Sequence, residues 1–204
     1  MVEKTRQRGR PRSFDSAVAL DCAAAVFWAK GFADTSLDDL SAAMGMGRPS
    51  IYNAFGDKEA LFIRVLERYR DTTGSSPLLA MDTKDSIRDA LDAFFGQIVE
   101  YTTADRSHLG CLVGSVAPVT EIPEVRRFLK ENLTATEAHI AERLSAAVQH
   151  GQLPSDYSPK RGTRRAINAM ISLAARARLG SSREELLGDA EDATSMVLAT
   201  RIAP

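Results

Sequence analysis

Hydrophobic residues recur every three or four positions along most of this chain, which is the spacing that places them on one face of an α-helix. The two-residue alternation of a half-buried strand is absent. The pattern therefore predicts an all-α protein. The first helix is predicted to begin at Ser13 or Asp15, either of which can cap it, and to end at Gly31. Its apolar stripe consists of Leu20, Ala23, Ala24, Phe27 and Trp28.

Two short helices with a tight turn between them are predicted next, within residues 37–58. The inward face of the first consists of Leu37, Leu40 and Met44. Gly45 follows the last of these, where a helix C-cap needs a positive φ that glycine adopts without steric cost. Pro49 lies near the first turn of the second helix, where its missing N–H is harmless. One helix therefore ends and another begins within about three residues.

The first short helix also has a cap pattern at its start. Thr35 or Ser36 can accept a hydrogen bond from its first turn, and Asp38 or Asp39 lies three residues further on in an approximate capping box. The pattern therefore predicts where this helix begins as well as where it ends.

The second short helix presents polar side chains to solvent. Ile51 and Phe55 are four residues apart and face inward. The side chains left outward are Arg48, Ser50, Tyr52 and Asn53. Short helical hairpins with a glycine turn are common in all-α proteins, but a second helix with an outward polar face is typical of the helix-turn-helix of DNA-binding proteins.

The residues before these helices form a basic arm. Residues 1–12 carry five basic side chains and one acidic side chain, a local charge of +4 in a chain of net charge −1. They include few apolar residues, so we expect the arm to be disordered in the free protein. Arg8, Arg10 and Arg12 lie in an Arg-Gly-Arg-Pro-Arg stretch that matches the core of an AT-hook, which binds a narrow minor groove. The alternative is a solvated tail.

Helical spacing continues to the end of the chain. The predicted later helices cover about residues 57–71, 84–103, 109–119, 123–151, 160–179 and 183–201, which makes nine helices in all. Residues 72–77, with the sequence TTGSSP, are predicted to form a loop.

A family resemblance covers residues 13–63. The shared motifs are Lys30-Gly31-Phe32, Thr35-Ser36-Leu37, Gly45, Ser50-Ile51-Tyr52, Phe55 and Asp57-Lys58-Glu59-Ala60-Leu61. In this stretch the chain resembles the N-terminal domain of the TetR/AcrR family of transcriptional regulators. The resemblance implies a DNA-binding domain over residues 13–58, a linking fourth helix over about 57–71, and an all-α ligand-binding and dimerisation domain over 59–204.

The resemblance also implies roles for single residues. Phosphate contacts are implied for Thr35 or Ser36, for Tyr52 and for Lys58. The side chains nearest the bases would be Arg48, Ser50 and Asn53. Lys58 also follows a plausible N-cap, Asp57, so it lies in the first turn of a helix, where a phosphate is favoured. Pro49 departs from the family, which more often has a small or polar residue there, and its contact with a base would be apolar.

Composition limits the class of protein. A chain of 204 residues with 44% hydrophobic content can bury a sizeable core. It contains no run of 18 apolar residues and no signal-peptide pattern, so we expect a soluble, cytoplasmic protein without a membrane partner. Cys22 and Cys111 show no CxxC spacing, which argues against a disulfide framework or a zinc site. Residues 1–70 carry a charge of +2 and residues 71–204 a charge of −3, so nucleic acid should contact the first part.

The predicted regulatory domain offers candidates for an effector pocket. They are Tyr69, Phe94, Phe95, Ile98, Tyr101, Cys111, Phe128 and Met170. For each residue singly, packing in the core is the competing role. Cys111 could alternatively act as a thiol sensor, although no basic neighbour in its segment lowers its pKa on sequence grounds.

Other function classes find little support. Three histidines show no metal-ligand spacing, and neither a phosphate-binding GxxxxGK[ST] nor a GxSxG motif is present, so we expect no enzyme, no metal and no cofactor. A helical adaptor without DNA binding would have no use for the basic arm or Lys58. The resemblance also implies the partners: double-stranded DNA with a near-palindromic operator, an unknown small-molecule effector, and a second copy of the chain that contacts residues 160–179 and 183–201.

Overall fold

The structure, a computed structural model, describes residues 15–105, 109–116 and 120–200, with only the backbone for residues 115 and 116. Within these residues the fold contains nine α-helices, two π-helical turns and no strand. The α-helices are α1 (Ser16–Asp34), α2 (Leu37–Met44), α3 (Arg48–Phe55), α4 (Lys58–Tyr69), α5 (Ser76–Asp82), α6 (Ile87–Thr103), α7 (Pro123–Gln149), α8 (Pro159–Arg178) and α9 (Arg183–Leu198). The π-helical turns are η1 (Arg70–Gly74) and η2 (Leu112–Val116). The all-α prediction is confirmed, and the basic arm lies outside the described residues.

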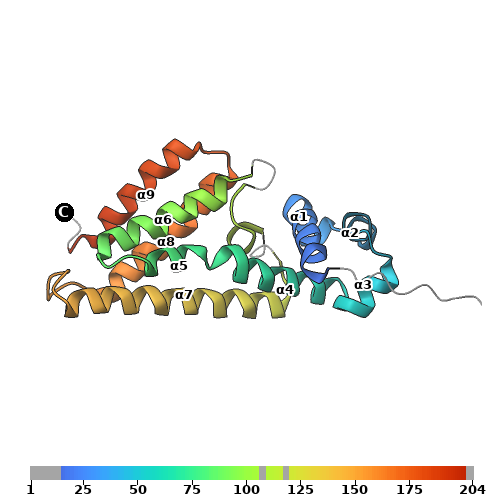
Figure 1. The fold of residues 1–204 in the computed structure, drawn as a ribbon, viewed down its shortest axis with the longest axis horizontal. Helices are drawn as coiled ribbons and strands as arrows, with labels where there is room; N and C mark the ends of the chain where they lie inside the picture. Colours follow the sequence, from blue (N-terminus) through green and yellow to red (C-terminus); the bar gives the residue numbers. More distant parts are fainter. Residues whose placement is uncertain (1–14, 106–108, 117–119, 201–204) are drawn as a thin grey trace, which may run out of the picture.

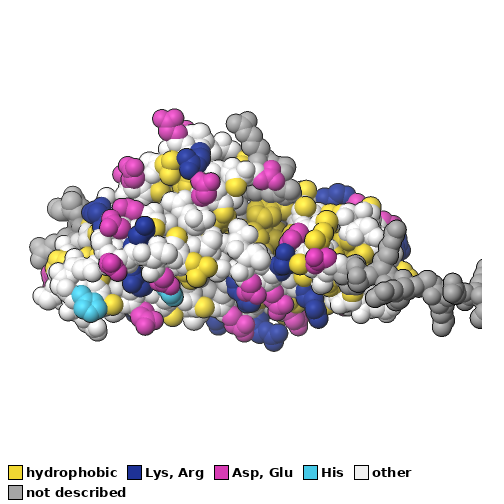
Figure 2. Space-filling model, viewed as in Figure 1, with side chains coloured by type: hydrophobic (Ala, Val, Ile, Leu, Met, Phe, Trp, Pro, Cys, Tyr) yellow, Lys and Arg dark blue, Asp and Glu magenta, His cyan; other side chains and the backbone are white. Residues whose placement is uncertain are grey.

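The helices form two groups along an elongated molecule. Figure 1 shows α1, α2 and α3 at one end, and α5, α6, α8 and α9 stacked above the long helix α7 at the other. Helix α4 lies between the two groups. On the face drawn in Figure 2, basic and acidic side chains are interspersed along α4 and α7, and hydrophobic side chains gather in a hollow between α1 and the larger group.

Helix α1 begins after one of its two predicted caps, and it is interrupted at Gly31, the predicted end, but continues to Asp34. The Asp15 side chain accepts a hydrogen bond from the backbone N–H of Ala17 at 2.8 Å, so Asp15 is the N-cap. Gly31 leaves the helical conformation at φ 75°, which glycine adopts without steric cost. By length and composition alone α1 is apolar enough to cross a membrane. In this fold, however, Phe27 and Trp28 pack inside the N-terminal core.

The N-terminal core extends further along the chain than residue 58. It contains the buried faces of α1 to α4, including Phe27, Phe62 and Tyr69, and it also takes in Leu112 and Phe128 from η2 and α7. By packing, α4 therefore belongs with α1 to α3. The predicted division into domains at residue 58 stays a prediction, and the hydrophobic contacts cross it.

The predicted loop at residues 72–77 is wrong. Backbone helix continues from α4 through η1, where the Ser75 N–H donates to the Arg70 carbonyl at 2.8 Å, and α5 follows at once. The Thr72 hydroxyl donates to the Arg68 carbonyl at 2.8 Å, and that of Ser76 to the Thr73 carbonyl at 2.7 Å. Small hydroxyl side chains therefore add hydrogen bonds to the carbonyl groups of this helical turn.

The remaining helices hold the C-terminal core. The stripe predicted for residues 84–103 is buried on α6, which starts three residues later than expected, at Ile87. Helices α8 and α9 pack against each other and against α6. The predicted buried helix at 109–119 is limited to the short turn η2 within the described residues. Side chains on the outer faces of α8 and α9 remain exposed, notably Ile171 at 49% and Met196 at 62%.

Candidate nucleic-acid interface and effector pocket

Helices α2 and α3 are held at a defined angle by their caps and turn. The Ser36 hydroxyl accepts from the Asp39 N–H, and the Asp39 carboxylate accepts from the Ser36 N–H at 2.9 Å, which completes a capping box. Lys30 first, and then Ser36, lower the pKa of Asp39 well below its usual range through their hydrogen bonds. At the other end Gly45 adopts φ 61° and ψ 27°, the left-handed conformation.

The orientation of α3 agrees with the sequence pattern. Ile51 and Phe55 are buried in the N-terminal core, together with Met46 from the turn. The side chains exposed on α3 include all of the predicted DNA-contacting residues of this helix, which are Arg48, Pro49, Ser50, Tyr52 and Asn53. Tyr52 is 49% exposed although it is large and aromatic. An exposed ring with a hydroxyl at its tip suits contact with a sugar-phosphate backbone.

Arg48 is oriented by an ion pair that the sequence did not reveal. Its Nε donates to Oδ1 of Asp38 at 2.8 Å and its Nη2 donates to Oδ2, so the guanidinium binds the carboxylate in a bidentate manner. The hydrogen bonds that Arg48 donates to Asp38 raise the pKa of Arg48 above its usual value. Both side chains are exposed, at 55% and 72%. The Arg48 guanidinium, which could read a base, is therefore bound to Asp38 of α2 in the absence of DNA.

The structure separates Thr35 from Ser36. Thr35 is only 1% exposed, and its hydroxyl donates to the Gly31 carbonyl at 2.6 Å. A phosphate cannot reach a hydroxyl that is buried and already donating its proton. Ser36 is exposed, although its hydroxyl donates to Oδ2 of Asp39 at 2.7 Å, so its phosphate contact stays a prediction.

Lys58 has partners inside the protein. Its ammonium donates to the Phe32 carbonyl at 3.0 Å and to the Thr35 carbonyl at 2.9 Å, and it lies 4.3 Å from the centre of the Phe32 ring. These carbonyls lie around the C-terminal end of α1, where a cation is favoured. Lys58 therefore links the start of α4 to the end of α1, and its phosphate contact stays a prediction.

We predict that Lys58→Met lowers the stability of the protein in the absence of DNA. The substitution keeps an apolar stem but removes two charge-assisted hydrogen bonds, and the expected loss is about 1–2 kcal/mol after allowance for partial solvent exposure. Urea unfolding measures this loss. Lys30→Met, which removes an exposed ion pair with Asp39, is the matched control and should cost much less.

The salt dependence of operator binding tests the other role of Lys58. If Lys58 contacts a phosphate in each half-site, the logarithm of the binding constant should depend less steeply on the logarithm of the salt concentration in the Lys58→Met protein. The slope should fall by roughly one per half-site. An unchanged slope together with lower stability would show that Lys58 acts only inside the protein.

An apolar cavity of about 520 Å³ lies within the larger group of helices, beside the end of α4. Its walls come from the end of α4, η1, α5, α6, η2, α7 and α8, and this volume is within the range of small-molecule sites. Of the predicted pocket residues, those that line it are Tyr69, Phe94, Tyr101, Cys111 and Met170. Arg70, Lys130 and Thr136 are among the polar residues that the sequence analysis missed, because nothing in the helical spacing marks them.

Three of the predicted pocket residues do not line this cavity. Phe95 and Ile98 are completely buried in the C-terminal core, on the same helix as Phe94. Phe128 belongs to the N-terminal core, and the Arg70 guanidinium lies 5.4 Å from the centre of its ring. For these three side chains the competing role, packing in the core, is the one that the structure shows.

Two phenols and a thiol meet in the cavity. Burial, and then the neighbouring Cys111 thiol, raise the pKa of Tyr69 and of Tyr101 well above the usual tyrosine value. The Tyr69 hydroxyl is buried and has no hydrogen-bond partner among the described residues. An unpartnered hydroxyl in an apolar cavity favours a ligand that carries a hydrogen-bond acceptor.

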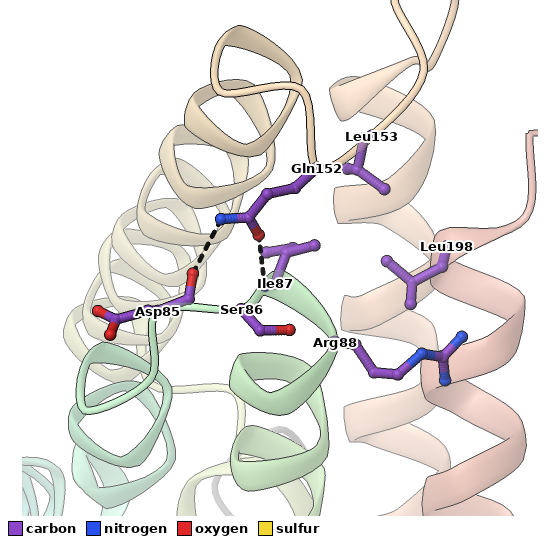
Figure 3. Close-up of a pocket in the computed structure, with 7 residues that line it drawn as sticks. All are labelled: Asp85, Ser86, Ile87, Arg88, Gln152, Leu153 and Leu198. Carbon is purple, nitrogen blue, oxygen red and sulfur yellow. Dashed lines mark hydrogen bonds between the residues drawn. The ribbon is translucent and has the colours of Figure 1, made fainter.

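A second hollow, at the far end of the C-terminal core, has hydrogen bonds between its lining residues. Figure 3 shows Gln152 between Asp85 and Ile87. Its amide oxygen accepts from the Ile87 N–H at 2.7 Å and its amide nitrogen donates to the Asp85 carbonyl at 3.0 Å. Gln152 therefore binds the first N–H of α6, next to the N-cap Ser86, and joins the end of α7 to the start of α6.

Taken together, an exposed polar helix behind a glycine turn and a separate helical core beside a cavity define a helix-turn-helix DNA-binding regulator. The sequence model of the bacterial regulatory proteins of the tetR family matches residues 19–65. The chain is also 30% identical over 194 residues to the HTH-type transcriptional repressor BdcR of Escherichia coli, a match that covers 93% of each chain. The protein therefore belongs to the TetR family of transcriptional regulators.

Other relatives agree with this assignment. The HTH-type transcriptional repressor ComR of Escherichia coli is 30% identical over 152 residues, which cover 73% of this chain and 72% of ComR. A cysteine mutant of the TetR-family regulator CifR, solved in complex with 26-bp double-strand operator DNA, superposes with a TM-score of 0.83 and 32% identity. That match covers 91% of this chain and 98% of CifR. The fold and the DNA-binding class predicted from the sequence are confirmed.

Proposed function

We propose that this protein is a homodimeric repressor that binds a near-palindromic operator and releases it when a small molecule occupies the cavity. Support for repression comes from BdcR and ComR, which are both repressors. The proposal includes no catalytic reaction, and binding to chromosomal DNA would place the protein in the cytoplasm of a bacterium.

The dimer would form through the outer faces of α8 and α9. Ile171, which also lines the cavity, and Met196 are large apolar side chains that stand exposed on these helices, and α8 is rich in small residues that let helices approach closely. A twofold dimer would present two copies of α3 to the same side of the duplex, about one helical turn apart or a little more.

The observation that carries the proposal is a direct contact between the cavity and the DNA-binding helices. Tyr69, which lines the cavity, packs edge-on against Trp28 of α1 with ring centres 5.3 Å apart. The Trp28 indole N–H donates to the Leu109 carbonyl at 3.2 Å, two residues before Cys111. From α8, Arg178 donates to the Trp28 carbonyl at 3.1 Å. A ligand that moves Tyr69 or the segment at Leu109 would therefore directly change the contacts of Trp28 on α1.

Selection of genomic DNA fragments by the purified protein tests the proposal. We expect enrichment of a near-palindromic site that two protomers occupy, with half-sites spaced by roughly one turn of DNA. A Tyr52→Ala, Asn53→Ala double variant, altered only on the exposed face of α3, should enrich no site. A reporter gene behind the selected site should be silenced by the wild-type protein. Enrichment of non-palindromic DNA by single protomers, or activation of the reporter, would contradict the proposal.

A further inference from the structure

The segment that carries Cys111 is fixed in place beside the cavity. The Gly110 N–H donates to the Thr102 carbonyl at the end of α6 at 3.0 Å, and Gly110 adopts φ 88°. After the cysteine, the chain turns back into η2, so that the Gly114 N–H donates to Cys111 Sγ at 3.3 Å. The thiol therefore has a defined position in the cavity wall, where its sulfur accepts a backbone N–H.

The cavity also supplies proton donors next to this thiol. Tyr69 is only 7% exposed, lines the same cavity, and its hydroxyl has no hydrogen-bond partner among the described residues. Because burial raises the pKa of both Tyr69 and Tyr101, the two phenols keep their protons at neutral pH. A nucleophilic sulfur beside a neutral hydroxyl in an apolar cavity is suited to an electrophile whose oxygen gains charge as it reacts.

From this geometry we propose that Cys111 is an addition site for small α,β-unsaturated carbonyl compounds, with Tyr69 as the proton donor to the carbonyl oxygen. The sulfur forms a bond to the β-carbon, the electron pair of the carbon–carbon double bond moves between the α-carbon and the carbonyl carbon, and the π pair of the carbonyl moves onto its oxygen. That oxygen takes a proton from the Tyr69 hydroxyl, and the thiol proton restores the phenol. The enol then tautomerises to the saturated carbonyl compound. The net reaction adds S–H across the double bond and needs no oxidant or reductant.

The consequence for DNA binding rests on the proposed function. Cys111 lies two residues from Leu109, whose carbonyl accepts hydrogen bonds from Trp28 of α1 at 3.2 Å and from Arg178 of α8 at 3.4 Å. An adduct on Cys111 has to be accommodated next to these bonds. It would therefore disturb α1 and release the operator.

Addition of cyclohexenone to the full-length protein, followed by mass spectrometry, tests the addition site. We expect one adduct, on Cys111, formed in the wild-type and Cys22→Ser proteins and absent in Cys111→Ser. Cys22 lies on α1 outside the cavity wall and is the matched control thiol. Tyr69→Phe should slow the addition by about tenfold or more, because general acid catalysis by a positioned group is lost.

Methyl methanethiosulfonate separates proton donation from a change of structure. This reagent modifies thiols without generating an oxyanion that needs the phenol, so Tyr69→Phe should leave its rate at Cys111 within about twofold of the wild-type rate. Tyr101→Phe, which removes the other phenol of the cavity, should leave the rates of both reagents close to those of the wild-type protein. Equal labelling of Cys22 and Cys111, an oxidised sulfur in place of the adduct, or equal slowing of both reagents would overturn the addition site.

Operator binding by the labelled protein tests the proposed function separately. Trp28 is the one tryptophan of the chain, so its fluorescence reports whether the adduct reaches α1. Release of the operator with a shift of Trp28 emission supports both proposals. A complete Cys111 adduct that leaves the operator bound would confirm the addition site and contradict release through this cavity.

Discussion

Replacing Arg48 with alanine is expected to weaken operator binding by about tenfold or more per half-site, and so by about a hundredfold or more for a dimer. Arg48 is exposed at the first turn of α3, the turn that enters the major groove in helix-turn-helix proteins. The substitution should leave the fold intact, because the ion pair with Asp38 is exposed and exposed pairs contribute little to stability. Titration of a labelled operator, with thermal unfolding as a check on the fold, measures the effect.

Asp38→Asn is expected to change operator affinity in the opposite direction. It removes a carboxylate that competes with DNA for the Arg48 guanidinium and that repels phosphates. The capping box of α2 uses Ser36 and Asp39, so the start of that helix is preserved. We expect tighter binding by a few-fold, most clearly at low salt. Equal losses in both variants would mean that the intact pair, and not the free guanidinium, is what the operator recognises.

Arg48→Lys separates base reading from phosphate contact. A lysine keeps the charge but cannot form the planar bidentate contact that arginine makes with guanine. If Arg48 reads a base, the variant should lose discrimination between the operator and a site altered at one base pair. If it contacts a phosphate, discrimination should stay as it is in the wild-type protein.

The predictions that depend on local chemistry agreed with the structure. The caps at Asp15 and Ser36, the left-handed Gly45 and the inward pair Ile51 and Phe55 follow from the backbone and from one helix face, which the spacing of residues determines. The prediction of a loop at residues 72–77 was wrong for a related reason. Its composition favours a turn, but the hydroxyl groups of Thr72 and Ser76 can equally bond helix carbonyls, and Pro77 is buried near the start of α5.

The parts of the site that need distant partners could not be predicted. Phe94 and Phe95 are neighbours on one helix, yet only Phe94 reaches the cavity, because the packing of α7 and α8 determines which side stays open. The same limit applies to Lys58, whose carbonyl partners on Phe32 and Thr35 are more than 20 residues away. A helical pattern gives the direction of a side chain relative to its own helix, and not what that side chain meets.

Gly162→Ala is expected to lower the free energy of unfolding by about 2–4 kcal/mol, or the melting temperature by about 5–10 °C. Gly162 is buried in α8, and an added Cβ would lie 2.0 Å from the Tyr157 hydroxyl oxygen and 2.9 Å from Cδ1 of Leu144. The Tyr157 ring would have to move, and its buried hydrogen bond to the Val197 carbonyl, 2.8 Å long, would be lost. The unpaired polar atoms and the overpacking together outweigh the gain of roughly 1 kcal/mol from the higher helix propensity of alanine.

Two variants isolate these contributions to the loss. Gly96→Ala, within α6, places a Cβ with nothing within 4 Å, so it should raise stability by up to about 1 kcal/mol through helix propensity alone. Tyr157→Phe removes the hydrogen bond to α9 but keeps the ring, so it should cost less than Gly162→Ala. Because α9 is half of the proposed dimer face, the glycine variant should also dissociate at higher protein concentration than the wild-type protein. A Gly162→Ala protein as stable as Gly96→Ala would mean that the Tyr157 ring is not held against α8 in solution.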